Sequence, residues 1–157
     1  MDIYEYLEKD HKKVAKLFSL YEKTNNQFYK IEIVDRIIEE LSVHATAEEE
    51  TFYKVLENYT DIFKDIKHSE KEHAEIFLQM KKLMSPQAID QSYDELVLSL
   101  KKLVEHHVDE EENKIFKEAK KVLSDAEAMK IKFQMHDFKE KIMNGLTEEM
   151  MDDLTVF

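Results

Sequence analysis

The fold of this chain is decided by the segment IEIVDRIIEELSVHATAEEETFYKV, residues 31–55. Apolar side chains recur in it at spacings of three and four residues, which is typical of one face of an amphipathic α-helix. His44 and Glu48 lie on that same face, because residues four apart in a helix point in the same direction. The stripe consists of Ile31, Val34, Ile37 or Ile38, Leu41, His44, Glu48, Phe52 and Val55. The segment therefore predicts a long helix, ending near Asn58, with two ionisable side chains on its buried face.

Three further segments, at residues 3–23, 62–83 and 96–119, show the same periodicity. Asp2 is the expected N-cap of the first helix, and Asp90 or Ser92 caps the last. Pro86 ends the third helix, because proline cannot donate a hydrogen bond within a helix. Four long helices with short links predict an antiparallel up-down four-helix bundle.

The composition agrees with an all-α fold. The chain has 157 residues, which is enough for one domain with a proper core and too few for two. One glycine and one proline leave little material for hairpin turns, whereas good helix formers are abundant.

The residues after the bundle predict a fifth helix. Residues 131–142 carry apolar side chains on one face, the single glycine, Gly145, is a candidate C-cap, and Thr147 resembles a new helix start. We expect residues 1–123 to form the bundle and residues 124–157 to form a C-terminal helical extension. Its apolar end, Met150, Met151, Leu154, Val156 and Phe157, would pack on the bundle, on a second copy in a homodimer or on a protein partner.

Charge excludes several classes of partner. The 35 acidic and 23 basic residues give a formal net charge of −12, which repels phosphate backbones and anionic lipids. We therefore expect no nucleic-acid or membrane partner. No apolar stretch approaches the roughly 18 residues of a membrane span, and no basic and apolar leader opens the sequence, so we expect a cytoplasmic protein.

Four histidines lie on the predicted buried stripes, one on each helix of the bundle. They are His11, His44, His73 and His107, and the second and fourth are each followed at i+4 by a glutamate, Glu48 and Glu111. Buried carboxylates cost several kcal/mol each unless they are paired or bound to metal, and no Lys or Arg lies on these stripes. Two metal ions, each bound by two of the histidines and bridged by the two glutamates, would balance the charge of both carboxylates. Because the chain has no cysteine, the donors favour iron, manganese or zinc.

This pattern closely resembles the hemerythrin family in its HHE form, over roughly residues 1–120. The family signature falls on Asp10-His11, on His44-Ala45-Thr46-Ala47-Glu48, on Glu72-His73 and on His107-Val108-Asp109-Glu110-Glu111. The resemblance implies a hemerythrin-like bundle in which these four histidines and two glutamates ligate two non-haem iron ions in a carboxylate-bridged di-iron centre. Manganese and zinc also suit the donors.

One departure from the family bears on function. Oxygen-carrying hemerythrins have a second histidine one turn after the first on the third helix, where this chain has Phe77, and an aspartate on the fourth, where it has a glutamate. The resemblance therefore points away from a simple oxygen carrier. We expect a di-iron protein that binds oxygen, nitric oxide or peroxide for sensing, storage or detoxification. The alternative is a di-iron enzyme or iron donor, acting in peroxide or nitric oxide turnover or in iron-sulfur cluster repair.

Other histidines have simpler interpretations. His106 competes with His107 for the inward position on the fourth helix, and the alignment of His107 with Leu100 and Ile115 favours His107. His68 is expected on the surface and His136 in a solvated or structural position. Asp10 and Glu49 are candidate hydrogen-bond partners of the histidine N–H groups.

Overall fold

The computed structural model describes residues 1–84 and 90–155, with side chains for residues 1–84 and 90–145. Every regular element in these ranges is helical. The elements are α1 (Ile3–Lys23), α2 (Gln27–Glu48), η1 (Glu49–Tyr53), α3 (Lys54–Leu56), α4 (Thr60–Leu83), α5 (Gln91–Glu110), η2 (Glu111–Ile115), α6 (Phe116–Val122) and α7 (Asp125–Thr155). None of the described helices is both long and apolar enough to span a membrane.

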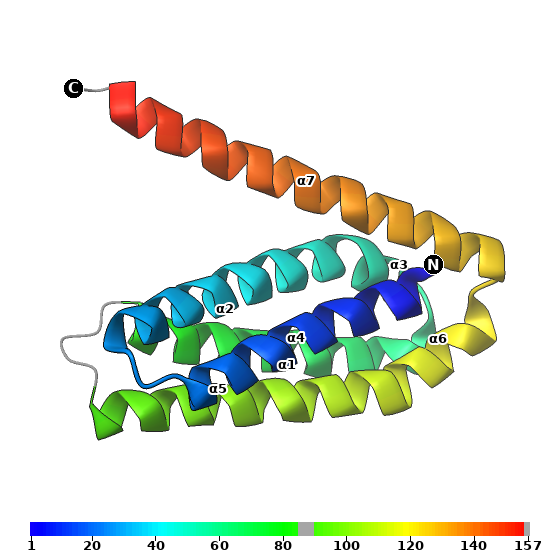
Figure 1. Cartoon of the computed structure of the whole chain (residues 1–157). Helices are drawn as coiled ribbons and strands as arrows, with labels where there is room; N and C mark the ends of the chain where they lie inside the picture. The colour runs from blue at the N-terminus through cyan, green and yellow to red at the C-terminus, as the bar shows by residue number, and fades with distance from the viewer. Residues whose placement is uncertain (85–89, 156–157) are drawn as a thin grey trace.

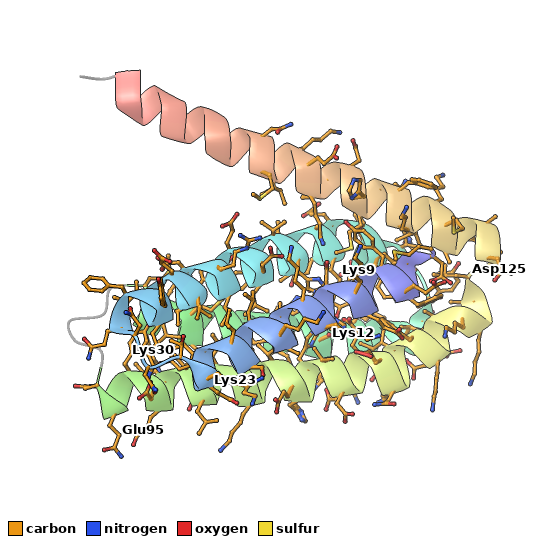
Figure 2. The ribbon with its side chains drawn as sticks, viewed as in Figure 1. Lys9, Lys12, Lys23, Lys30, Glu95 and Asp125 are labelled. Carbon is orange, nitrogen blue, oxygen red and sulfur yellow. The ribbon has the colours of Figure 1, made fainter. Side chains whose placement is uncertain are left out.

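The first four helical runs form an antiparallel up-down bundle, as the sequence predicts (Figure 1). α2 continues directly through η1 into α3, and α5 continues through η2 into α6. The closest pairings are between α1 and α2 and between α4 and α5. Charged side chains such as Lys12, Lys23 and Glu95 lie on the exposed outside of the bundle (Figure 2).

Side-chain caps fix where the helices begin. Asp2 accepts a hydrogen bond from the Glu5 amide at 3.0 Å, as expected, and Asp90 rather than Ser92 caps α5 by accepting from the Tyr93 amide at 3.2 Å. α7 starts at a reciprocal capping box, in which Ser124 and Glu127 each accept from the other's amide at 3.1 Å. These caps satisfy amides that have no partner inside the helix.

Two π-helical turns, η1 and η2, interrupt what the sequence predicts as continuous α-helix. Each lies directly at a buried glutamate, since η1 follows Glu48 and η2 begins at Glu111. The wider π turn changes which residues face inward. After Glu48 it buries Thr51, Phe52 and Tyr53 consecutively, which one stripe of an α-helix does not do. Periodicity gives no signal for such a turn, so the sequence does not predict either of them.

The core consists of two apolar clusters with the candidate site between them. On α1, Leu7 belongs to one cluster and Val14 to the other, and His11 lies between. The same order holds on α4, where His73 separates Ile66 from Ile76. Well-packed layers on both sides hold the polar layer in place.

Helix α7 packs its first half on the bundle and diverges from it toward its C-terminal end (Figure 1). Ala128, Ile131 and Met135 are buried in the cluster that includes Ile3, and α7 contacts α1, α2 and η1. The expected cap at Gly145 and restart at Thr147 are wrong, because α7 continues through both to Thr155. The packing of the apolar end at 150–157 lies outside the described side chains, and the boundary at residue 123 stays a prediction.

Candidate metal centre

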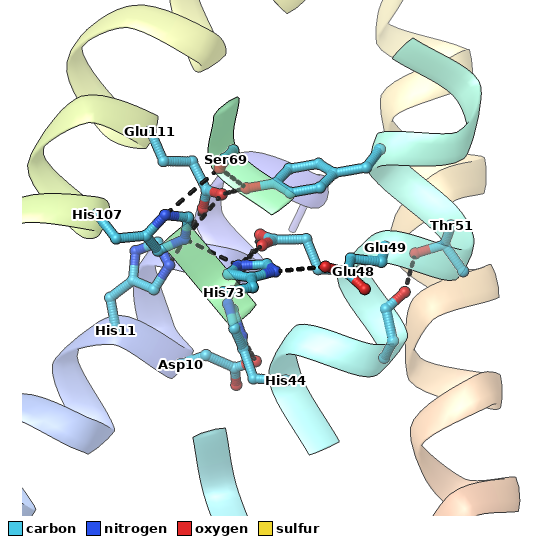
Figure 3. A network of polar contacts seen from close by, with 12 residues as sticks. Asp10, His11, His44, Glu48, Glu49, Thr51, Ser69, His73, His107 and Glu111 are labelled. Carbon is cyan, nitrogen blue, oxygen red and sulfur yellow. Dashed lines mark hydrogen bonds and ion pairs between the residues drawn. The ribbon is translucent and has the colours of Figure 1, made fainter. Parts of the chain in front are cut away.

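The four predicted histidines and two predicted glutamates converge inside the bundle (Figure 3). Glu48 and Glu111 have no solvent exposure, and the side chain of His44, the most exposed of the six, is 9% exposed. The donor atoms form two groups, each within 4.8 Å: His11, His44, Glu48 and Glu111 in one, and Glu48, His73 and His107 in the other. Each group holds two histidines, and Glu48 belongs to both.

Each carboxylate reaches one histidine of each pair. Glu48 places Oε1 at 3.2 Å from His73 Nε2 and Oε2 at 3.6 Å from His44 Nε2. Glu111 places Oε1 at 3.2 Å from His11 Nε2 and Oε2 at 3.6 Å from His107 Nε2. All four histidines therefore turn Nε2 toward the carboxylates, an arrangement that suits two cations bridged by two carboxylates.

The remaining histidines lie outside this cluster. Of the two alternatives on α5, the structure places His107 inward at 4% exposure, whereas the side chain of His106 is 64% exposed. His68 and His136 are also on the surface. His136 lies near Tyr6, with 3.1 Å between its Nδ1 and the tyrosine oxygen.

Each inward histidine also has a carboxylate at Nδ1, contributed by a neighbouring helical run. The pairs are His44 with Asp10 at 2.8 Å, His73 with Glu49 at 3.0 Å, His107 with Glu72 at 3.3 Å and His11 with Glu112 at 3.0 Å. A carboxylate at Nδ1 fixes that nitrogen as the donor and leaves Nε2 free to bind a metal. Asp10 and Glu49 were candidates from the sequence, but Glu72 and Glu112 were missed. The available signal was that all four carboxylates are sequence neighbours of a predicted ligand.

Charge is distributed unevenly in the protein without metal. Burial disfavours the cationic form of His11, but Glu111 and Glu112 outweigh it and raise the pKa of His11 to about 10. Burial likewise opposes protonation of His73, but Glu48 and Glu49 raise its pKa to about 10. Although burial also acts against ionisation of Glu111, His11 and His107 hold its pKa below the usual range. The Glu111 carboxylate is thus held ionised and can bind a cation.

Tyr53 is also part of this polar layer. Its hydroxyl donates a hydrogen bond to Glu111 and lies 2.6 Å from the Ser69 hydroxyl oxygen. Its ring stacks on His73 with 5.5 Å between centroids. Burial, followed by the nearby charges of Glu111 and Glu48, raises the pKa of Tyr53 well above its ordinary value, so it acts as a neutral donor.

Unsatisfied polar atoms test whether these residues fit a metal. Among the described side chains, seven buried nitrogen and oxygen atoms lack a hydrogen-bond partner, and five of them are in this cluster. The five are Nε2 of His11 and His44, both oxygens of Glu48, and Oε1 of Glu111. Buried polar groups normally have partners. A pair of cations would coordinate all five atoms, so the residues fit the metal centre that the sequence predicts.

A small cavity lies against the histidine side of the cluster. Its volume is about 20 Å³, and all four inward histidines line it. Most of its remaining wall is apolar, formed by Val14, Leu41, Ala45, Ile76, Phe77, Met80, Val104 and Val108, with Asp10 beside them. A cavity of about 10–15 Å³ is enough for one water-sized molecule. The space therefore suits a ligand of very few atoms.

The fold and these residues define a four-helix bundle built around a buried histidine-carboxylate cation site. The family model of the hemerythrin HHE cation-binding domain matches residues 2–119, so this chain belongs to the hemerythrin HHE family. A crystal structure of a hemerythrin HHE cation-binding domain-containing protein from Mycobacterium kansasii superimposes with a TM-score of 0.80. The two sequences are 23% identical, and the superposition covers 96% of this chain and 92% of that chain. This likeness shows that the two proteins share a fold. No curated protein matches significantly.

Proposed function

We propose that this protein holds two non-haem iron ions bridged by Glu48 and Glu111, with His11 and His44 on one ion and His73 and His107 on the other. It would bind oxygen, nitric oxide or peroxide for sensing, storage or detoxification. When bound, the irons would supply open coordination positions and reversible one-electron chemistry. The chain's own residues orient the histidines, keep the Glu111 carboxylate ionised and exclude bulk water.

The cavity of about 20 Å³ against the four histidines is the observation that carries the choice of ligand. Its volume admits a diatomic molecule or a peroxide and excludes an organic substrate. Phe77, at the position of the additional histidine in oxygen carriers, lines this cavity instead of offering a nitrogen. The arrangement therefore supports a small ligand reaching the centre from the histidine side.

The test is metal content per chain, combined with optical spectra of the iron-loaded protein. Spectra are recorded after reduction under nitrogen and then after adding oxygen, nitric oxide or peroxide. We expect two irons and a charge-transfer spectrum that responds to at least one ligand. Sustained consumption of peroxide or nitric oxide would indicate the enzyme alternative, and two manganese or zinc ions with no affinity for iron would overturn the di-iron assignment.

A matched pair of variants separates the centre from surface binding. Glu48→Leu with Glu111→Leu removes both buried carboxylates, whereas Glu50→Leu with Glu75→Leu removes two exposed ones. Only the first pair should abolish iron binding and the ligand-responsive spectrum. Retention of two irons by that variant would contradict the proposal.

A further inference from the structure

A second histidine-glutamate cluster lies on the outside of the bundle, between α4 and α5. It consists of His68 and Glu72 on α4 and of His106 and Glu110 on α5. Each pair has i, i+4 spacing, so each helix presents one imidazole and one carboxylate in the same direction. On α5, His106 and Glu110 each come one residue before the inward pair His107 and Glu111 and have the same spacing. It is distinct from the buried centre because the side chains of His68 and His106 are 58% and 64% exposed.

The histidine nitrogens lie at distances from the carboxylate oxygens that are close to those between ligands of one ion. His68 Nε2 lies 3.7 Å from Glu72 Oε2 and 3.3 Å from Glu110 Oε2. His106 Nε2 lies 3.3 Å from Glu72 Oε2 and 3.0 Å from Glu110 Oε1. Ligands at zinc-type bond lengths of about 2.0–2.2 Å in a tetrahedron are separated by about 3.3–3.6 Å. Donor atoms of His68, Glu72 and Glu110 lie within 4.8 Å of one another, and His106 lies beside this group as a fourth donor that would have to turn toward the ion.

The charges at this cluster also suit a cation. Among the described residues, Glu72 and Glu110 form ion pairs only with histidines, and no Lys or Arg lies within ion-pair distance of either carboxylate. Glu72 is held firmly, since its side chain is only 10% exposed and its Oε1 lies 3.3 Å from His107 Nδ1. One anchored carboxylate and three adjustable side chains can close around an ion without moving the helices.

We propose that His68, Glu72, His106 and Glu110 form an exterior site for one divalent transition-metal ion, of the class of Zn²⁺, Co²⁺ or Fe²⁺. Two neutral imidazoles and two carboxylates are a donor set that this class prefers. Through its two oxygens, Glu72 would connect the exterior ion to the buried ligand His107. The proposal goes beyond the buried centre and does not depend on which metal that centre holds.

The test is the number of Zn²⁺ ions bound per chain at micromolar free zinc, by equilibrium dialysis and elemental analysis. The full chain is compared with His68→Ala/His106→Ala. The matched control is His136→Ala, which removes another exposed histidine paired at i, i+4, with 3.1 Å between His136 Nε2 and Glu140 Oε1. Both substitutions are on the surface, and thermal melts confirm that each variant is folded.

We expect the full chain and His136→Ala to bind one more ion per chain than His68→Ala/His106→Ala. With Co²⁺ as the probe, the double variant should lose the intense visible bands of a tetrahedral site. Equal stoichiometry and equal Co²⁺ spectra in all three proteins would overturn the proposal and leave surface ion pairs only. The test compares folded proteins that all keep the buried centre. Its result therefore does not depend on whether that centre binds iron.

Discussion

The carboxylate of Asp10 on α1 accepts a hydrogen bond from Nδ1 of His44 on α2, at 2.8 Å. The same relationship is repeated around the bundle. Glu49 of η1 pairs with His73 of α4, Glu72 of α4 with His107 of α5, and Glu112 of η2 with His11 of α1. The four pairs form a closed ring, in which each helical run orients the histidine of the next. The ring predicts that carboxylates outside the ligand set control metal affinity.

Replacing Glu49 with glutamine should weaken metal binding about 10–100-fold, the usual effect of losing a carboxylate that orients a ligating histidine. The amide still accepts from His73 Nδ1 but no longer supplies the negative charge that strengthens the hydrogen bond. Competition against a chelator of known affinity gives the ratio of the metal dissociation constants of the variant and the unchanged protein. Glu50→Gln is the matched control, because it makes the same charge change at an exposed neighbour. Equal affinities of the two variants would argue against the ring.

Metal binding should release about two protons per chain at neutral pH. Without metal, His11 and His73 each have a pKa raised to about 10, so both are protonated at neutral pH. A metal needs the lone pair on Nε2, and the proton must therefore leave. As pH rises through about 10 both histidines lose these protons before metal binds, so the release should fall.

Calorimetric titration of metal in buffers with different ionisation enthalpies measures this proton release. The His68→Ala/His106→Ala background avoids contributions from the exterior cluster. A release that does not change between neutral pH and pH values near 10 would show that the two histidines are not protonated in the metal-free protein.

The sequence predicts well which histidines and glutamates turn inward, because burial and spacing both constrain them. His44 and Glu48 can share an apolar stripe only if the helix buries both, and the structure places both inward. The partners at Nδ1 are harder to predict, since Glu72 lies in a segment of mixed charge and Glu112 in an acidic run, and neither differs from a surface residue in the sequence alone. The π turns were unpredictable for another reason. They change the face presented by Thr51, Phe52 and Tyr53 without any residue type that marks such a turn.

Gly145 shows where a local rule fails. A glycine after an apolar stripe commonly ends a helix, yet α7 continues through it, and a Cβ at Gly145 would meet no atom within 4 Å. The surrounding sequence favours helix strongly enough to include one glycine, at a cost of about 1 kcal/mol relative to alanine.

The contact of α7 with the bundle should contribute measurably to stability. Met135 is fully buried against the cluster that contains Ile3 and Leu7. Met135→Ala should lower the free energy of unfolding by about 2–5 kcal/mol, because it removes buried methylene groups and leaves a cavity. Phe133→Ala is the control on the same helix, where the side chain is 59% exposed, and should cost much less. Chemical denaturation of the metal-free proteins measures both changes, and equal effects would mean that α7 does not pack on the bundle in solution.

Tyr53→Phe should destabilise the metal-free protein by about 1–3 kcal/mol, because it removes a buried donor from a carboxylate that remains charged. The phenyl ring can still stack on His73 and fill the same volume, so the effect isolates the hydroxyl, which donates to Glu111. Tyr29→Phe removes a hydroxyl from a side chain that is 58% exposed and should change stability little. Denaturation curves with and without bound metal separate two roles for Tyr53. A cation on Glu111 compensates part of the lost hydrogen bond, so the loss should be smaller in the metal-loaded protein. No loss in either form would assign Tyr53 to packing alone, and an equal loss in both forms would show that a bound cation does not compensate for the lost hydrogen bond.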